Sequence, residues 1–233
     1  MQRTISAMVG KGSVNHNSRK FRAENVDGTR THLNIDYCNE NIKTVYHELF
    51  DEALERYNAK QIRSDRKIKD YYEKIRSSKQ EKPFHEIILQ VGGKGNMNAD
   101  TENGELAKQI LDEYYQGFQE RNPQLRVFSA HLHMDEATPH LHIDFVPFTT
   151  GSKRGLDTRV SLKQALATQG FKGGSRGDTE WSQWLHPYAD EPRIPEVVDF
   201  APENPDSIHP KSALPVLRFP YQHSYFLYRP PVK

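Results

Sequence analysis

Residues 125–147, LRVFSAHLHMDEATPHLHIDFVP, combine two apolar stretches with a short polar connection between them. Side chains alternate across a β-strand, so residues two positions apart share a face. Each stretch therefore has an apolar face and a face that carries two histidines. The histidines are His131, His133, His140 and His142. The pattern predicts an antiparallel hairpin whose apolar face packs on a core.

The same pattern predicts a metal site on the imidazole face. Across a short connection His133 can lie opposite or beside His140, with His142 one pleat further along. Three imidazoles from two strands can hold a metal ion, and Asp135 and Glu136 in the turn can add an oxygen ligand or a hydrogen-bond acceptor. The alternative is a set of surface histidines on a solvated sheet. Two His-X-His pairs around an Asp-Glu turn favour the metal.

Hydrophobic periodicity predicts the elements around this hairpin. The expected strands cover residues 3–9, 32–37 and 84–91, and the expected helices cover residues 41–58, 64–80, 99–121 and 160–169. No internal repeat is present. The fold class that follows is α+β, an antiparallel β-sheet with helices packed on it and the metal site on a central hairpin.

The charge of the 233-residue chain is balanced overall but uneven along its length. Lysine and arginine number 32 and the acidic residues 31. Three stretches are nevertheless basic: residues 1–30 with six basic and two acidic side chains, 56–79 with nine and three, and 153–176 with six and one. Any one of them could be an ordinary solvated face. Together they favour a polyanionic partner.

Other features favour a cytoplasmic protein. The single cysteine, Cys38, excludes a disulfide framework and suits a reducing compartment. No run of 18 apolar residues is present, and the first 17 residues lack the apolar core of a signal peptide.

The composition changes after Trp184. Ten of the fourteen prolines follow this residue, while all fourteen glycines precede it. We therefore expect a folded domain over residues 1–184 and a proline-rich tail over residues 185–233 that contributes little to the core.

Three motifs resemble those of the Mob/Pre (MobV-type) plasmid mobilisation relaxases, a branch of the His-hydrophobe-His endonucleases. HMDEATPHLH at 133–142 is similar to the metal motif of that family, HNSR at 16–19 to its first motif and RTHLN at 30–34 to its second. Gly155-Leu156-Asp157 and Arg159 lie where such proteins continue. The resemblance covers roughly residues 1–184. The family usually continues with a long helical region, which the proline-rich tail here does not resemble.

The resemblance implies a chemistry. Such enzymes bind the origin of transfer as single-stranded or hairpin DNA, nick one strand and stay joined to its 5′ end. His133, His140 and His142 would hold a divalent metal, Mn²⁺ or Mg²⁺, at the scissile phosphate, and Zn²⁺ could bind more tightly without being the working ion. Glu136 would be a metal ligand, or an acceptor that orients a histidine or takes a proton.

The resemblance also assigns the attacking group to His16. The rival nucleophiles are the helical tyrosines Tyr46, Tyr57, Tyr71, Tyr72, Tyr114 and Tyr115. Residues near His16 and in the other motifs are expected to contact DNA. They are Asn17, Arg19, Lys20, Arg22, Arg30, Asn34 and Arg159.

Two other functions remain open from the sequence. The chain could be a catalytically impaired, truncated DNA-binding remnant or repressor derived from a mobilisation gene. It could also be a zinc hydrolase of a small substrate, although the basic stretches with interspersed aromatic residues argue against that class. The sequence leaves the oligomeric state open.

Overall fold

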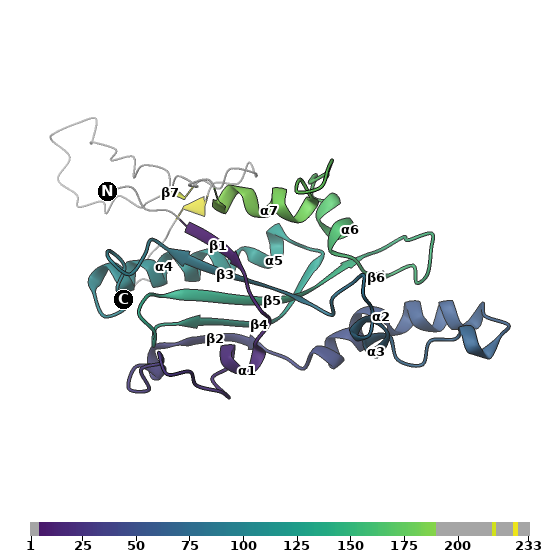
Figure 1. Cartoon of the computed structure of the whole chain (residues 1–233), viewed down its shortest axis with the longest axis horizontal. Coiled ribbons are helices and arrows are strands. Elements are labelled where there is room, and N and C mark those ends of the chain that lie inside the picture. Colours follow the sequence, from purple (N-terminus) through teal and green to yellow (C-terminus); the bar gives the residue numbers. More distant parts are fainter. Residues whose placement is uncertain (1–4, 190–215, 218–225, 228–233) are drawn as a thin grey trace.

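The computed structural model describes residues 5–189, 216–217 and 226–227 (Figure 1). An antiparallel sheet runs in the order β1-β3-β5-β4-β2, and β6 pairs with the end of β5. Its strands are β1 Ile5–Val9, β2 Ile35–Asn39, β3 His85–Val91, β4 Leu125–His133, β5 His140–Thr149 and β6 Arg159–Val160. The helices are α1 Val14–Asn17, α2 Ile42–Ala59, α3 Tyr71–Arg76, α4 Glu102–Gln116, α5 Phe118–Arg121, α6 Leu162–Ala167 and α7 Glu180–Ala189. The predicted α+β class is confirmed.

The predicted hairpin is the pair β4–β5 at the centre of this sheet. His133 lies opposite His140, and His131 lies opposite His142. The alternate residues of both strands are fully buried in the main apolar cluster. They include Ala130, Leu132, Leu141 and Ile143. The hairpin therefore has the apolar face and the imidazole face that alternation predicts.

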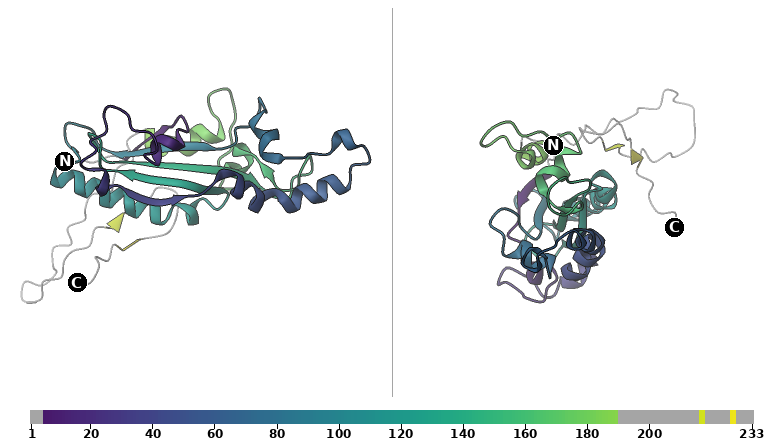
Figure 2. Two further views of the ribbon diagram at one scale, coloured as in Figure 1. Left: turned by 90° about the horizontal axis from the view of Figure 1, so that it is seen from below. Right: turned by 90° about the vertical axis from the view of Figure 1, so that its right-hand side faces the viewer.

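Two apolar clusters support the two faces of the sheet. Helices α4 to α7 pack on one face through the main cluster, and Figure 2 shows α4 and α1 on opposite sides of the strands. The imidazole face is divided along its length. His142 lies toward one end of β5, while Val146 and Phe148 pack further along it with α2 and α3 in the second cluster.

Most of the predicted elements are confirmed within a few residues. The strands expected at 3–9, 32–37 and 84–91 correspond to β1, β2 and β3, and the helices expected at 41–58 and 160–169 correspond to α2 and α6. The helix expected at 99–121 is interrupted. The side chain of Thr101 accepts a hydrogen bond from the Gly104 amide at the start of α4, and Gly117 separates α4 from α5.

The helix expected at 64–80 is wrong. Residues Ser64–Arg66 form a 3₁₀ turn, and only Tyr71–Arg76 form a helix, α3. The side chain of Asn58 donates to the Ile68 carbonyl at 2.8 Å and accepts from the Ile68 amide at 2.9 Å. Because both backbone groups of Ile68 are bonded to a side chain, the chain stays extended there until Asp70 caps α3.

Helix α7 lies across the expected boundary between residues 184 and 185. This helix was not predicted, although Trp181, Trp184 and Leu185 have the spacing of one helix face. Trp184 is buried in the main cluster, and Leu185 packs against it. Apart from the end of α7 and the short paired strands β7 Val216–Leu217 and β8 Phe226–Leu227, the expected tail lies outside the described residues. Among the described residues, no helix is long and apolar enough to cross a membrane.

Gly104 gives a test of the packing of α4. A Cβ atom at this position would lie 2.3 Å from the Asn98 carbonyl oxygen and 2.8 Å from the Ala99 Cα. Gly104→Ala should therefore lower the free energy of unfolding by about 2 kcal/mol in urea titrations, although alanine is the better helix former. Gly95→Ala is the control, since nothing lies within 4 Å of its Cβ position. Equal stability of the two variants would contradict the close packing.

Candidate metal centre

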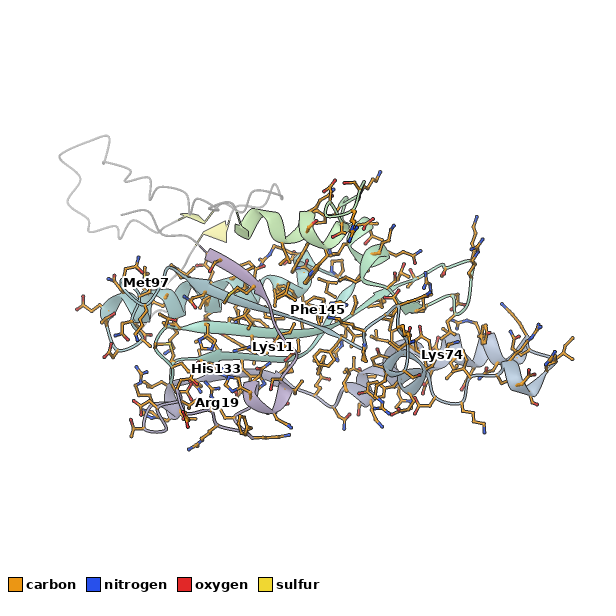
Figure 3. The ribbon with its side chains drawn as sticks, in the orientation of Figure 1. Lys11, Arg19, Lys74, Met97, His133 and Phe145 are labelled. Carbon is orange, nitrogen blue, oxygen red and sulfur yellow. The ribbon has the colours of Figure 1, made fainter. Side chains whose placement is uncertain are left out.

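Three histidines of the central hairpin lie together on one face of the sheet. The ring centroids of His133 and His140 are 5.1 Å apart, those of His133 and His142 4.8 Å, and those of His140 and His142 5.0 Å. All three side chains are buried. Figure 3 places His133 beside Arg19 and far from Lys74 of α3. The structure thus brings together the three residues that the sequence predicts as metal ligands.

Hydrogen bonds to backbone carbonyls fix the tautomers of two of these rings. His133 donates from Nε2 to the Asn17 carbonyl at 2.8 Å, and His140 donates from Nδ1 to the Thr138 carbonyl at 2.9 Å. A carbonyl oxygen only accepts, so the other ring nitrogens carry lone pairs. These two nitrogens, Nδ1 of His133 and Nε2 of His140, lie 3.3 Å apart. Two ligands at about 2.1 Å from one ion would have this spacing.

The third ring is held by a buried carboxylate. The Glu86 Oε1 atom accepts from His142 Nδ1 at 2.7 Å. Nε2 of His142 is buried and has no hydrogen-bond partner among the described residues. Each of the three rings therefore has one nitrogen fixed by an oxygen acceptor and one nitrogen free for a ligand, which is the arrangement of metal-binding histidines. The residues present fit a divalent metal.

Two sets of three residues could each hold a metal ion, because within each set the donor atoms all lie within 4.8 Å of one another. One comprises His16, His133 and His142, and the other comprises His133, Glu136 and His140. Among the described residues neither set contains all three predicted ligands. His133 belongs to both sets, so the five residues form one continuous group. His131 belongs to neither set. It is fully buried, and its Nδ1 lies 2.6 Å from Asp36 Oδ1.

His16 lies beside this group, on the short helix α1. Its ring centroid is 6.0 Å from those of both His133 and His142. Its Nε2 atom is 3.3 Å from Arg19 Nη1 and 3.5 Å from Glu136 Oε1. A guanidinium group only donates, so this nitrogen carries a lone pair. Burial and then the charge of Arg19 lower the pKa of His16, which keeps the ring neutral near pH 7.

Asp135 joins the three sequence motifs. This fully buried carboxylate forms an ion pair with Arg19 and accepts a hydrogen bond from Asn34 Nδ2 at 2.8 Å. Burial alone would raise its pKa, but the bonds from Arg19 and Asn34 together lower the pKa to about 2. Arg19 itself has a φ of 54°, in the left-handed region that favours glycine. The ion pair therefore holds a strained residue at the end of α1.

Four of the predicted DNA contacts form hydrogen bonds or ion pairs within the protein. Asn17 is 1% exposed and donates from Nδ2 to Glu86 at 2.7 Å and to Asp144 at 3.0 Å. Asn34 also accepts from the Met134 amide. The other two are Arg19, paired with Asp135 and Glu136, and Arg30, which donates to the Glu136 carbonyl at 2.7 Å.

The remaining predicted DNA contacts lie in two places. Lys20 and Arg22 are exposed just after α1, next to Phe21, which is 61% exposed. Arg159 lies opposite Thr149 at the far end of β5. The structure therefore does not bring Arg159 together with the histidines.

Sequence reasoning missed two buried carboxylates, Glu86 and Asp144. They lie opposite each other on β3 and β5, and the Asn17 amide bridges them. Burial and the charge of Glu86 raise the pKa of Asp144 to about 6. Gly10 leaves room for Glu86, because a Cβ atom there would lie 2.0 Å from Glu86 Oε2. The available signal was an acidic residue inside each predicted strand, on the face that bears His142.

These features define a class of protein: an α+β domain with a candidate metal centre on its central hairpin and a neutral histidine beside it. Residues 12–170 match the family of plasmid recombination enzymes (Mob_Pre). The chain belongs to that family, and the predicted resemblance is confirmed.

Two named relatives are plasmid recombination enzymes of Staphylococcus aureus. The type 3 enzyme is 28% identical over 157 residues, which are 66% of this chain and 33% of the relative. The type 2 enzyme of strain Mu50 is 27% identical over 191 residues, 76% of this chain and 41% of the relative. The chain thus spans between a third and two fifths of the length of these relatives.

A solved structure also resembles the chain. It is the MobM relaxase domain bound to the origin-of-transfer DNA of plasmid pMV158, with manganese, and it is 21% identical with a TM-score of 0.43. The match covers 69% of this chain and 76% of that one.

Asp135 makes stability depend on pH. Because its folded pKa is below the ordinary value of 3.8, it stabilises the protein above pH 4, and this contribution of about 2 kcal/mol disappears between about pH 4 and pH 2. Asp135→Asn should lower the free energy of unfolding by about 3 kcal/mol at pH 7, and the difference from wild type should shrink on acidification.

Urea titrations at several pH values measure this difference in the free energy of unfolding. Asp65→Asn, in an exposed pair with Arg63, should change little. A pH-independent difference for Asp135→Asn would contradict the assignment.

Glu86 should control metal affinity through His142. Glu86→Gln removes the charge that fixes the His142 tautomer, so the dissociation constant for Mn²⁺ should rise 10- to 100-fold in calorimetric titrations. Glu105→Gln on the exposed side of α4 is the control and should bind Mn²⁺ like the wild type. Unchanged affinity of a folded Glu86→Gln protein would show that Glu86 does not orient a ligand.

Proposed function

We propose that this chain is the relaxase part of a plasmid mobilisation protein. It binds origin-of-transfer DNA in the bacterial cytoplasm and nicks one strand by metal-assisted transesterification, which leaves a covalent 5′-phosphoryl adduct. The observation that carries the proposal is the neutral His16 ring, whose Nε2 lone pair lies beside histidine nitrogens that are free for a metal. Membership of the plasmid recombination enzymes supports it.

His16 is the attacking group of the proposal. The hydrogen bond from Arg19 to its Nε2 atom breaks, and the Nε2 lone pair forms a bond to phosphorus. The bond from phosphorus to the 3′ oxygen breaks with its electron pair on that oxygen, and the oxygen takes a proton from solvent. The phosphoramidate keeps a reactive bond, so the free 3′ hydroxyl can later reverse the step. As the ring gains positive charge, the Glu136 carboxylate 3.5 Å away stabilises it.

The six rival tyrosines are engaged elsewhere. Tyr114 is part of the main apolar cluster, and Tyr115 packs against it. Tyr46 and Tyr71 are part of the second cluster, and Tyr57 and Tyr72 pack against that one. The Tyr46 hydroxyl donates to the Pro83 carbonyl, and the Tyr71 hydroxyl accepts from the Val160 amide. A buried and partnered hydroxyl is poorly placed to attack a phosphate, which favours His16 over Tyr46 and Tyr71.

His133, His140 and His142 would hold the metal. A bound Mn²⁺ or Mg²⁺ would withdraw charge from the non-bridging oxygens of the scissile phosphate. Glu136 lies 3.8 Å from His140 Nε2, so it can add the oxygen donor that these two ions prefer. Arg19 holds Glu136 through their ion pair and holds His16 through a hydrogen bond of 3.3 Å to its backbone carbonyl.

Exposed residues after α1 would contact the DNA strand near the scissile phosphate. Phe21 offers a free aromatic face for stacking of an unpaired base. Lys20 and Arg22 on either side of it can contact the adjoining phosphates. This arrangement suits single-stranded DNA, whose bases are free to stack.

A covalent protein–DNA product tests the function. We would incubate the protein and Mn²⁺ with 5′- and 3′-labelled oligonucleotides tiled over the DNA that flanks its own gene, and with the pMV158 origin strand. The wild type should give a denaturant-resistant band that carries the DNA on the 3′ side of the nick. His16→Ala should abolish the band but keep Mn²⁺ binding, whereas His140→Ala should abolish both.

Tyr72→Phe is the matched control and should form the band like the wild type. A band that survives in His16→Ala and disappears in a tyrosine variant would assign attack to that tyrosine. DNA binding without a band from any oligonucleotide would contradict the nicking proposal and favour a DNA-binding remnant.

A further inference from the structure

The direction of the Glu136 carboxylate decides what the histidine group can offer a metal besides nitrogen. Glu136 is the single carboxylate in that group of five residues, and the other four are histidines. Its side chain is 13% exposed. The last torsion of a glutamate, which turns the carboxylate, has no sharply preferred value. The oxygen that faces the histidines is therefore selected by the groups that bond to the carboxylate.

Two residues between α1 and β2 bond to the two oxygens of this carboxylate separately. The Arg19 Nη2 atom donates to Oε1 at 2.9 Å, and the Asn25 Nδ2 atom donates to Oε2 at 2.6 Å. Oε1 is also the oxygen near the imidazoles, at 3.5 Å from His16 Nε2 and 3.8 Å from His140 Nε2. Asn25 thus occupies the oxygen that is not directed at the histidines.

The segment that carries Asn25 is fixed against the turn that carries Glu136. The Asp27 amide donates to the Asp135 carbonyl at 2.7 Å. The Arg30 guanidinium donates to the Glu136 carbonyl, also at 2.7 Å. Both bonds end on backbone atoms of the turn, so they set the position of the segment relative to the Glu136 backbone. Asn25 therefore approaches Glu136 from a held segment, although its own side chain is exposed.

Arg19 alone would not hold the carboxylate in this direction. Arginine and carboxylate groups frequently pair through two parallel hydrogen bonds. A Glu136 carboxylate that turned into such a pair would direct both oxygens at Arg19 and away from the imidazoles. The bond from Asn25 opposes this rotation, because it retains Oε2. Since the amide is neutral, it does so without a second positive charge that would repel a metal ion.

The candidate metal ions depend unequally on this oxygen. Zn²⁺ binds well to three imidazoles, whereas Mn²⁺ and Mg²⁺ prefer sites that include oxygen ligands. His133, His140 and His142 each have a nitrogen available to any of these ions. A fixed Oε1 atom of Glu136 should therefore add more to the affinity for Mn²⁺ than to the affinity for Zn²⁺.

We propose that Asn25 is a positioning residue. Its bond to Oε2 presents Oε1 of Glu136 as a single-oxygen ligand and so shifts the preference of the site from Zn²⁺ toward Mn²⁺. The proposal rests on the proposed function for the metal-binding role of Glu136. Asn25 acts through Glu136, so its role requires no contact with DNA or with the reacting atoms.

Metal binding in the absence of DNA provides the test. Calorimetric titrations, with a competing chelator for Zn²⁺, measure the dissociation constants of the two ions. Asn25→Ala should raise the constant for Mn²⁺ about 10-fold and that for Zn²⁺ less than about 3-fold, because partners that orient a ligand contribute about 10- to 100-fold to the affinity of an ion that needs this ligand. The ratio of the two constants should thus move toward Zn²⁺.

Three further variants separate this role from a general disturbance of the site. Glu86→Gln disturbs His142, an imidazole that both ions use, so both constants should rise and their ratio should stay close to that of the wild type. In a Glu136→Ala background, Asn25→Ala should have no further effect, because the carboxylate through which it acts is gone. Asn39→Ala, at the exposed end of β2, is the matched control and should bind both ions like the wild type.

An unchanged ratio in an Asn25→Ala protein with the wild-type urea midpoint would overturn the proposal. So would an effect of Asn25→Ala that persists in the Glu136→Ala background. A wild type that binds no Mn²⁺ would overturn both this proposal and the metal role in the proposed function. Failure of the nicking proposal alone is distinguishable: the wild type would then form no covalent band, while Asn25→Ala would still shift the ratio of the two constants.

Discussion

The pairing of His133 with His140 is the constraint on which the candidate site depends. Side chains alternate along β4 and β5, so a slip of one residue on β5 would turn His140 and His142 into the main apolar cluster and bring Leu141 to the face of α1. Leu132 and Leu141 oppose the slip, because both are fully buried on the other face. The apolar packing of one face thus sets the register, and the register brings the imidazoles of the other face together.

The position of His16 depends on buried polar groups. A helix of four residues such as α1 is not stable alone. It is held where Asn17 bonds to Glu86, Asp144 and, through its carbonyl, His133, and where Arg19 bonds to Asp135. Burial of these carboxylates would be costly without such partners. The bonds that offset this cost also orient the candidate ligand His133 and the adjacent His16. The protein therefore forms the geometry of the site as it folds.

Much of the fold could be predicted from local patterns, and the exceptions have physical reasons. Alternation located the hairpin and its three histidines. It could not show that the Asn58 side chain on α2 would bond to the backbone of Ile68 and prevent the expected 64–80 helix. Nor could it show that Asn17 would face inward, because its partners Glu86 and Asp144 lie on distant strands. The acidic residues inside β3 and β5 were visible, but only the pairing of the strands places Glu86 beside His142.

Charge is distributed differently at the two ends of the sheet. Around the histidines, Arg19 is neutralised by Asp135 and Glu136, so it orients neighbouring groups and adds little net attraction for a phosphate. At the far end of the sheet six exposed cations form no ion pair within the described residues: Lys60, Arg66, Lys67, Lys69, Lys153 and Arg154. The two ends of the domain therefore differ: one bears exposed cations without ion-pair partners, and the other bears imidazoles that buried carbonyls and a carboxylate hold in place. For the nicking reaction proposed above, this separation would leave the interactions at the reacting phosphate for the transition state.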